Sequence, residues 1–441
     1  MRPRVRFLDT RPLRDSRPFR DLWIGTSLSS LGGQIATVAV LAQVWDLTGS
    51  PVGTGTIGLA TGLPMVLFGL LGGALADAVD RRALVRATAT GQLLAAAGLC
   101  AQALADNRNV PLLLALVATG TACGALGAPA RRTFPVRLLP ADQVAAGLAL
   151  TNVSFQAAML AGPALAGLII AHWGYPAAYA AQAAAVAVSL LAVIRLPAIR
   201  PEHRPEPGDT EAAPAEGWGS VIVRRPTLWG SMATDLSATL LAMPIALFPL
   251  VNEIRFDGDP QTLGLFLSAV AIGGITAGLL SGTVTRWRRG GLVQLTAAGI
   301  WSLALAGFGL AGPLWLALGC LAVAGAADTV SVITRSALVQ LETPDAYRGR
   351  VSSVEHVIGV AGPELGNFRG GLLASVTSAP VSLVVGGLSA ALAIATVAAT
   401  NAPLRGYRTP PPAPPVAHAP TTGDRPGPPP DRGGEIDALA P

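Results

Sequence analysis

The chain is a succession of long apolar runs separated by short polar loops. Twelve runs can be counted, each about 20 or more residues long, which is the helix length needed to cross a hydrocarbon core. Because backbone groups in lipid must bond within their own segment, each run is predicted to be a helix. The predicted spans are 21–45, 53–76, 83–105, 111–130, 143–171, 174–195, 227–251, 261–284, 291–311, 313–335, 350–376 and 379–401.

Composition supports a membrane protein over a soluble one. Only 13% of the residues are charged and 51% are hydrophobic, whereas soluble domains carry about 25% charged residues. The spans leave room for loops, one linker and two polar ends, but not for a separate catalytic domain. No Gly-rich loop of the phosphate-binding type and no metal-ligand spacing is present. We therefore expect neither an enzyme nor a bound cofactor or metal.

The distribution of positive charge predicts the orientation in the membrane. All 31 basic residues are Arg. If the N-terminus is cytoplasmic, every Arg lies on the inner side except Arg108 and Arg255 in outer loops and Arg369 within span eleven. This placement counts Arg335 as an inner-loop residue and follows the positive-inside rule. It predicts a multi-pass protein of the cell membrane with both termini cytoplasmic, and it explains the net charge of +5 without nucleic acid.

The two halves of the chain resemble each other at an offset of about 205 residues. The loop from Arg131 to Pro140 after span four, for example, matches Arg335 to Pro344 after span ten. Duplication of a six-span unit is common in secondary transporters. The predicted fold is an all-α membrane protein of twelve transmembrane helices in two six-helix pseudo-repeats. Its predicted parts are an Arg-rich arm (1–20), the first half (21–195), a linker (196–226), the second half (227–401) and a disordered Pro-rich tail (402–441).

The loop after span two carries a recognisable motif. It reads Gly-x-Leu-Ala-Asp followed by an Arg pair, and the sequence there resembles the major facilitator superfamily. The matching positions are Gly73, Leu75, Ala76, Asp77, Arg81 and Arg82, whereas Ala78 and Asp80 depart from the pattern. Glycine lets helices approach closely, and an Asp at a helix end can pair with a facing cation. The resemblance implies the major facilitator fold and a role for this loop in conformational change.

Span five resembles the signature that exporters of this superfamily carry at the same place. Gly162, Pro163 and Gly167 match it, and Ala replaces Gly at positions 158 and 166. Small residues permit close helix packing and Pro permits a bend. A generic packing face is the alternative explanation, and it would not distinguish export from import.

Further segments resemble one branch of the superfamily, the drug:proton antiporters that include siderophore (enterobactin) and macrolide exporters. These segments are Phe19–Gly25, Val44–Ser50, Ala242–Pro249, Thr343–Val351 and Gly362–Gly366. The resemblance implies export of small amphipathic molecules driven by proton entry. None of the motifs identifies the substrate.

Ionisable residues within spans are the candidates for proton coupling, because they are costly in hydrocarbon and usually face the protein interior. The first six spans contain no intramembrane carboxylate, so coupling is expected in the second half. Asp235 in span seven and Glu364 in span eleven lie deepest, and Asp328 in span ten is a third candidate with a structural role as the favoured alternative. A pair between Glu364 and Arg369 is the structural alternative for Glu364.

Polar residues on apolar helices are candidates for a substrate cavity. Gln34 belongs to a polar stripe on span one, Asn152 and Gln156 are four residues apart on span five, and Glu355 lies near the cytoplasmic end of span eleven. Hydrogen bonding between helices is the alternative role. We expect a monomeric secondary exporter in the lipid bilayer that exchanges a small-molecule substrate for protons by alternating access. A nutrient importer of the same fold and a membrane sensor or scaffold without transport remain alternatives.

Overall fold

The computed structural model describes residues 9–132, 134–195, 222–280, 289–344 and 347–408, and regular structure in these ranges is entirely helical. The first half contains α1 (Arg11–Asp15), α2 (Arg17–Thr48), α3 (Pro51–Ala78), α4 (Arg81–Leu104), α5 (Val110–Arg132), α6 (Phe134–Leu138) and α7 (Ala141–Ile194). The second half contains α9 (Pro226–Ala242), η1 (Ile245–Leu247), α10 (Phe248–Arg255), α11 (Pro260–Leu279), α13 (Gly290–Leu310), α14 (Leu314–Glu342), α15 (Arg348–Val376), α16 (Ala379–Thr400) and α17 (Ala402–Gly406).

The described helices accommodate the twelve predicted spans. Ten helical segments are long and apolar enough to cross a membrane, and α9 to α10 form one of them. Another, 146–194, is long enough for two crossings and turns at Gly174, whose φ of 74° lies in the left-handed region that favours glycine. The 29-residue α15 carries more charge than the others but has the length of a span. The predicted all-α, twelve-span fold is thus confirmed.

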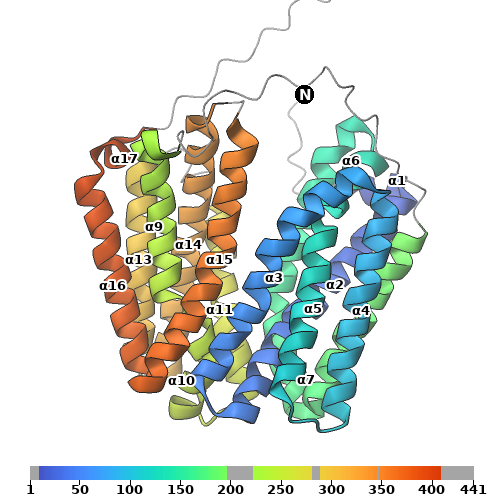
Figure 1. The fold of residues 1–441 in the computed structure, drawn as a ribbon, viewed down its shortest axis with the longest axis horizontal. Helices are drawn as coiled ribbons and strands as arrows, with labels where there is room; N and C mark the ends of the chain where they lie inside the picture. The colour runs from blue at the N-terminus through green and yellow to red at the C-terminus, as the bar shows by residue number, and fades with distance from the viewer. Residues whose placement is uncertain (1–8, 133, 196–221, 281–288, 345–346, 409–441) are drawn as a thin grey trace, which may run out of the picture.

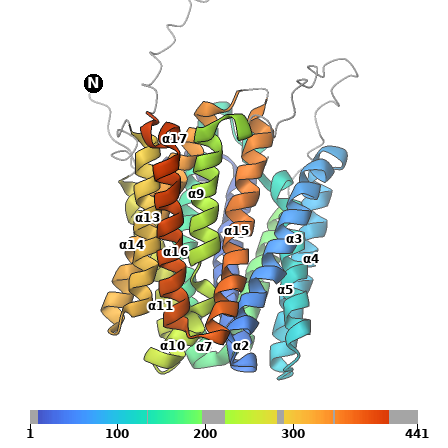
Figure 2. The ribbon, with the colours of Figure 1, turned by 60° about the vertical axis from the view of Figure 1, so that its left-hand side comes forward.

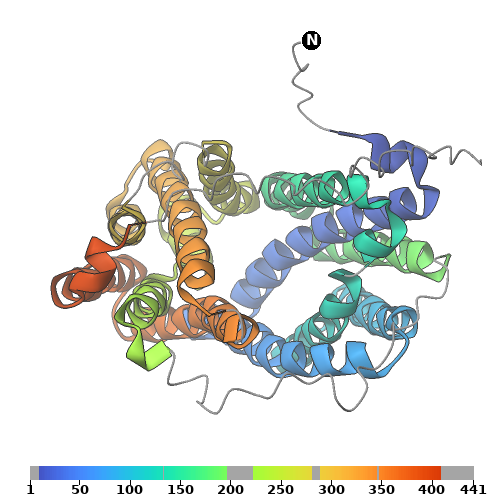
Figure 3. The same cartoon turned by 90° about the horizontal axis from the view of Figure 1, so that it is seen from above.

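Two groups of helices stand side by side (Figure 1), with α2–α7 in one and α9–α17 in the other. Seen from above, the two groups lie on either side of a central line (Figure 3). The ribbons are close at the end where α2 leads into α3, which is the predicted outer end. They diverge toward the end that carries α6 and α17, the predicted cytoplasmic end (Figure 1). This arrangement has the form of two six-helix pseudo-repeats.

Contacts between the halves concentrate toward the outer end. There α15 lies along α3, as a second view also shows (Figure 2), and α11 lies along α7. The hydroxyl of Thr54 donates to the carbonyl of Ala246 at 2.7 Å, and that of Ser268 donates to the carbonyl of Leu160 at 3.0 Å. Each bond joins one half to the other.

Local sequence explains where many helices begin. Ser16, Asp80, Asp259 and Ser378 each precede a helix, and their side chains accept hydrogen bonds from backbone N–H groups of its first turn. Such caps satisfy donors that a helix leaves unpaired. Asp80, which departs from the superfamily pattern, therefore has a structural role at the start of α4.

The prediction of one continuous helix for span seven is wrong. The helix breaks after Ala242, passes through η1 and resumes as α10. Met243-Pro244 explains the break, because Pro lacks an N–H and disfavours helical backbone in the residue before it. The second segment is held by Phe248, which packs edge-on against Phe266 and Phe308 with ring centroids 5.5 Å away in both pairs.

Span ten is longer than predicted. α14 continues to Glu342, where Thr343-Pro344 ends it, so Arg335 lies inside the helix and is 7% exposed. Placing Arg335 in a cytoplasmic loop is therefore wrong. Nothing between Arg335 and Glu342 breaks a helix, because this segment contains neither Gly nor Pro.

The start of the predicted disordered tail is ordered. Ala402–Gly406 form α17, whose Leu404 is fully buried. Asn401 holds it in place: the side-chain amide donates to the carbonyl of Pro226 at 2.6 Å and accepts from the N–H of Leu404 at 3.0 Å. Residues 409–441 of the tail, 196–221 of the predicted linker and 1–8 of the arm lie outside the described residues.

Candidate functional site

A buried ion network joins three helices of the second half. Arg335 on α14 forms an ion pair with Asp235 on α9, and its Nε donates to Oε1 of Glu355 on α15 at 3.2 Å. The hydroxyl of Ser336 donates to the same Oε1 at 2.9 Å. Asp235 and Arg335 are each 7% exposed. Since an ionised group is costly to bury alone, each member of the network depends on the others.

The network has more acid than base. One oxygen of Asp235, Oδ2, is buried without a hydrogen-bond partner. Asp328 lies two turns before Arg335 on α14, within electrostatic reach of both Asp235 and Arg335, and its side chain is exposed. Two carboxyl groups therefore pair with one guanidinium, and a third lies nearby. The structure brings together three residues predicted separately, Asp235, Asp328 and Glu355, around an Arg that was not predicted to lie there.

Glu364 occupies a different place, at the contact between the two halves. It lies on α15 near Thr61 on α3 and near Asn367; the hydroxyl of Thr61 itself donates to the carbonyl of Ile57 at 2.9 Å. A methyl group added at Gly58 of α3 would come within 2.5 Å of the Glu364 carbonyl oxygen, and one at Gly62 within 2.6 Å of its Cβ. Only glycine at these two positions lets α15 approach so closely.

The alternative pair between Glu364 and Arg369 does not form. The Nε of Arg369 donates to the carbonyl of Leu240 at 2.9 Å, and its Nη2 donates to that of Leu241. Both carbonyls lie at the end of α9, where the break in span seven leaves them without helical partners. Arg369 therefore stabilises the helix break, and Glu364 has no ion-pair partner among the described residues.

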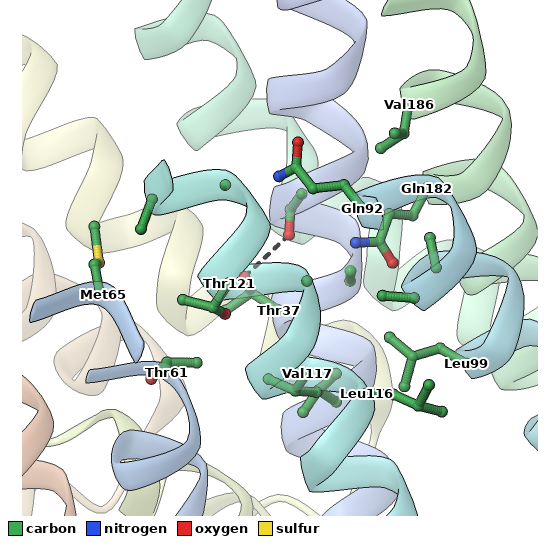
Figure 4. Close-up of a pocket in the computed structure, with 18 of the residues that line it drawn as sticks. Thr37, Thr61, Met65, Gln92, Leu99, Leu116, Val117, Thr121, Gln182 and Val186 are labelled. Carbon is green, nitrogen blue, oxygen red and sulfur yellow. Dashed lines mark hydrogen bonds between the residues drawn. The ribbon is translucent and has the colours of Figure 1, made fainter. Parts of the chain in front are cut away.

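The first half contains an apolar pocket of about 370 Å³. Its wall comes from α2, α3, α4, α5 and α7, and Figure 4 shows the side chains around it. The lining is mostly aliphatic, and its polar side chains are Thr37, Thr61, Gln92, Thr121 and Gln182. A largely apolar cavity with a few hydrogen-bonding groups is suited to a small amphipathic molecule. Thr61 also lies within reach of Glu364, so the pocket wall extends to the contact between the halves.

The predicted cavity residues lie outside this pocket. Gln34 packs against α7, where a methyl group at Gly162 would lie 2.4 Å from its Cβ. Asn152 lines a smaller pocket of about 300 Å³ between α2 and α7, together with Ser27 and Ser30. Gln156 is partly buried on α7 and lines neither pocket.

The motif of span five lies at the outer contact between the halves. A methyl group at Gly167 would come within 2.6 Å of the carbonyl oxygen of Pro260 on α11. The carbonyl of Pro163 approaches α11 equally closely, since a methyl group at Gly264 would lie 2.4 Å from it. Gly167 and Pro163 therefore serve the packing of one half against the other, whereas Gly162 packs against α2 within the first half.

The motif after span two spans the end of α3 and the start of α4. Gly73 and Asp77 lie in the last turns of α3, and their side-chain surroundings lie outside the described residues. Arg81 is the first residue of α4. The Nη2 of Arg82 donates to the carbonyl of Ile194 at the end of α7 at 2.6 Å. Arg82 thus ties this loop to the last helix of the first half.

Sequence reasoning missed the pocket residues Gln92 and Gln182. Both are amides within strongly apolar spans, and a polar side chain in such a span is the sequence feature that could have identified them as pocket residues. It also missed Arg131, which was placed in an inner loop but lies in the last turn of α5. The Nη2 of Arg131 donates to Oε1 of Gln92 at 3.5 Å.

Comparison with known proteins identifies membrane transporters as relatives of this chain. Residues 10–416 match the sequence model of the family described as transmembrane secretion effector. The enterobactin exporter EntS of Citrobacter koseri is 26% identical over 411 residues, which cover 91% of this chain and 96% of that protein. EntS of Shigella flexneri is 26% identical over 367 residues, covering 83% and 87% respectively.

Solved structures share the fold at low sequence identity. The nucleoside transporter NupG superposes with a TM-score of 0.63 at 16% identity, covering 86% of this chain and 99% of NupG. A bacterial homologue of the human lysosomal transporter Spinster, in an inward-facing and unoccupied conformation, gives a TM-score of 0.62 at 16% identity, covering 90% and 97%. The D-xylose–proton symporter gives 0.62 at 15% identity, covering 86% and 95%.

Proposed function

The chain belongs to the transmembrane secretion effector family of the major facilitator superfamily, and from this premise we propose that it exports small amphipathic molecules in exchange for protons. It is a multi-pass membrane transporter with a small-molecule substrate. The EntS relatives favour a siderophore or a similar secreted compound as the cargo. Protons moving down their gradient supply the driving force, and the two halves alternate between inward-open and outward-open states.

The position of Glu364 is the observation that carries this proposal. Glu364 lies where α15 packs on Gly58 and Gly62 of α3, and it has no cation partner among the described residues. Closing the outer end around an ionised carboxylate is costly, whereas closing it around the neutral acid is not. A proton taken up from the outside would thus permit closure and be carried inward.

Thr61 supplies the link between the proton and the substrate. Thr61 lines the pocket of the first half and lies near Glu364. A molecule that binds the pocket beside Thr61 changes the surroundings of the acid. Binding of cargo from the cytoplasm would then favour release of the proton, which is the requirement for exchange.

The ion network of the second half is proposed as a second proton-sensitive element. Protonation of Asp235 would weaken its pair with Arg335 and leave the guanidinium to Glu355 and Asp328. Because these groups lie on α9, α14 and α15, the change would alter the packing of three helices. Asp77, Arg81 and the residues Gly162–Gly167 are proposed to set the balance between the two states at the two ends of the molecule.

The arrangement in the membrane is part of the same proposal. Both termini are cytoplasmic, which places the end closed by α3, α7, α11 and α15 outside and the divergent end inside. The protein functions as a monomer, because each monomer contains both halves and the contact between them.

Transport by purified protein in proteoliposomes tests the proposal. The vesicles carry an imposed pH gradient, and both uphill transport and downhill exchange of a fluorescent amphipath are measured. Glu364→Gln and Asp235→Asn should each abolish uphill transport, while downhill exchange by Glu364→Gln stays within about threefold of wild type. The matched control is Glu253→Gln, whose carboxylate is exposed on α10 and belongs neither to the ion network nor to the contact around Glu364. Uphill efflux at the wild-type rate in both variants would refute proton coupling at these acids.

The direction of flux separates export from the alternatives. Accumulation inside right-side-out vesicles would show an importer. No flux for any substrate, with Glu364→Gln altering stability alone, would show a sensor or scaffold.

A further inference from the structure

Arg131 is a cation placed at the cytoplasmic end of the apolar pocket. The face of α5 that lines the pocket includes Thr121, Gly124 and Ala128, and Arg131 continues this face one turn further. Its guanidinium folds back along the helix, since a methyl group at Gly127 would lie 3.1 Å from its Nη2. The guanidinium therefore lies between α5 and α4, and it bonds to Gln92, whose side chain lines the pocket.

The hydrogen bonding of Arg131 is incomplete. Its bond to Gln92 is long, at 3.5 Å, and its Nε is buried without an acceptor. No carboxylate of the described residues forms an ion pair with it. A guanidinium within a membrane span normally has an anionic or carbonyl partner, because the charge is costly there. The partner that would satisfy Arg131 is thus missing from the described protein.

We propose that Arg131 binds the anionic group of the cargo, so that the transported molecules are amphipathic anions whose apolar body fills the pocket. This inference rests on the proposed export function and names its substrate class. The planar guanidinium can bind a carboxylate or a similar acidic group through two parallel hydrogen bonds. Thr121 and Gln182 then offer hydrogen bonds to the polar groups of the body, and the aliphatic wall excludes water from it.

A matched pair of fluorescent probes tests the proposal by equilibrium binding. Dansylglycine carries a carboxylate, and dansylglycine amide has the same body without the charge. Binding is measured to the purified full-length protein in a neutral detergent, so that anionic lipid cannot supply the negative charge. Wild type should bind dansylglycine at least tenfold more tightly than the amide.

Substitution of Arg131 should remove this preference. Arg131→Gln should weaken binding of dansylglycine about tenfold and change binding of the amide less than twofold. Arg131→Lys keeps the charge and should retain part of the preference. Arg86→Gln is the matched control, because Arg86 is exposed on the neighbouring α4, and it should behave as wild type. If wild type binds both probes with equal affinity, the proposal is wrong. It is also wrong if a folded Arg131→Gln protein keeps the wild-type ratio of the two affinities.

Flux measured in parallel separates this proposal from the export function. If wild type transports both probes and Arg131→Gln affects neither, the assignment of Arg131 is wrong and export stands. If binding prefers the anion through Arg131 but no flux occurs, the anion site stands and the transport function is wrong.

Discussion

The two halves of the molecule carry an Arg at corresponding positions, but the two side chains differ in their bonding partners. Arg131 ends the fourth span and Arg335 lies near the end of the tenth, at an offset of 204 residues that also relates Pro140 to Pro344. Arg335 is bound by Asp235 and Glu355. Among the described residues, Arg131 has one long bond, to an amide. Within this part of the chain, the same scaffold therefore holds a paired cation in one half and an unpaired one in the other.

The residues at corresponding positions of the two halves also differ. At an offset of about 205, Ser30 corresponds to Asp235 and Thr151 to Glu355. Hydroxyls thus occupy the first half where carboxylates occupy the second, and both hydroxyl residues line the small pocket between α2 and α7. This difference fits the proposed functions of the two halves, in which charges of the second half respond to protons and the pocket of the first half receives cargo.

Substitution of each Arg in turn should give the largest difference in stability between the two halves. Arg335→Gln leaves two buried carboxylates without a cation, and loss of one partner of a buried ion pair costs about 3–5 kcal/mol. Arg131→Gln removes an unsatisfied charge and should leave stability unchanged or slightly raised. The measurement is the thermal unfolding midpoint of both variants in detergent.

A compensating variant serves as the control. Replacing all three charges, with Arg335→Gln, Asp235→Asn and Glu355→Gln together, should recover most of the lost stability, because no buried ion of the network is left unpaired and Asp328 is exposed. Wild-type unfolding of Arg335→Gln alone would show that the network contributes nothing to the folded state.

The contact between the halves offers the second test. Gly58→Ala places a methyl group 2.5 Å from the carbonyl oxygen of Glu364, so the outer end cannot close without a shift of α15. Overpacking of this kind costs about 1–3 kcal/mol, which lowers the outer-closed population and the transport rate by roughly tenfold. Gly69→Ala on the same helix is the control, because its methyl group meets no atom within 4 Å. Equal efflux by both variants would contradict a closure role for this contact.

Much of the fold could be predicted from the sequence, because hydropathy alone determines which segments enter the membrane. The spans, a break between spans five and six within two residues of Gly174, and the duplication all follow from local pattern. The ends of helices were less predictable: positive-inside counting cannot distinguish a loop Arg from a buried one, so both Arg131 and Arg335 were assigned to loops. Pro244 is a signal for the helix break, but the apolar run on both sides of it favours one continuous span.

The candidate site was predicted as separate residues and not as an arrangement. Asp235 and Glu364 were identified because carboxylates are rare in spans. Their partners come from distant segments: Arg335 follows Asp235 by 100 residues, and Thr61 belongs to the other half. Only tertiary packing determines such pairs. The pocket amides Gln92 and Gln182 were missed for the same reason, since a single polar residue on an apolar helix is equally consistent with a bond between helices.

The ends of the two halves give the test with the smallest expected effect. The last helix of the first half is held by Arg82, which donates to the carbonyl of Ile194, and that of the second half is followed by α17. Truncation after Tyr407 keeps α17 and should leave insertion and transport within twofold of wild type. Truncation after Thr400 removes the bonds of Asn401 and the burial of Leu404, which together contribute about 2–4 kcal/mol. It should therefore lower the unfolding temperature by several degrees, as measured on the two truncated proteins side by side. A loss of transport in the longer protein would instead show that residues beyond Tyr407 dock on the bundle or bind a partner.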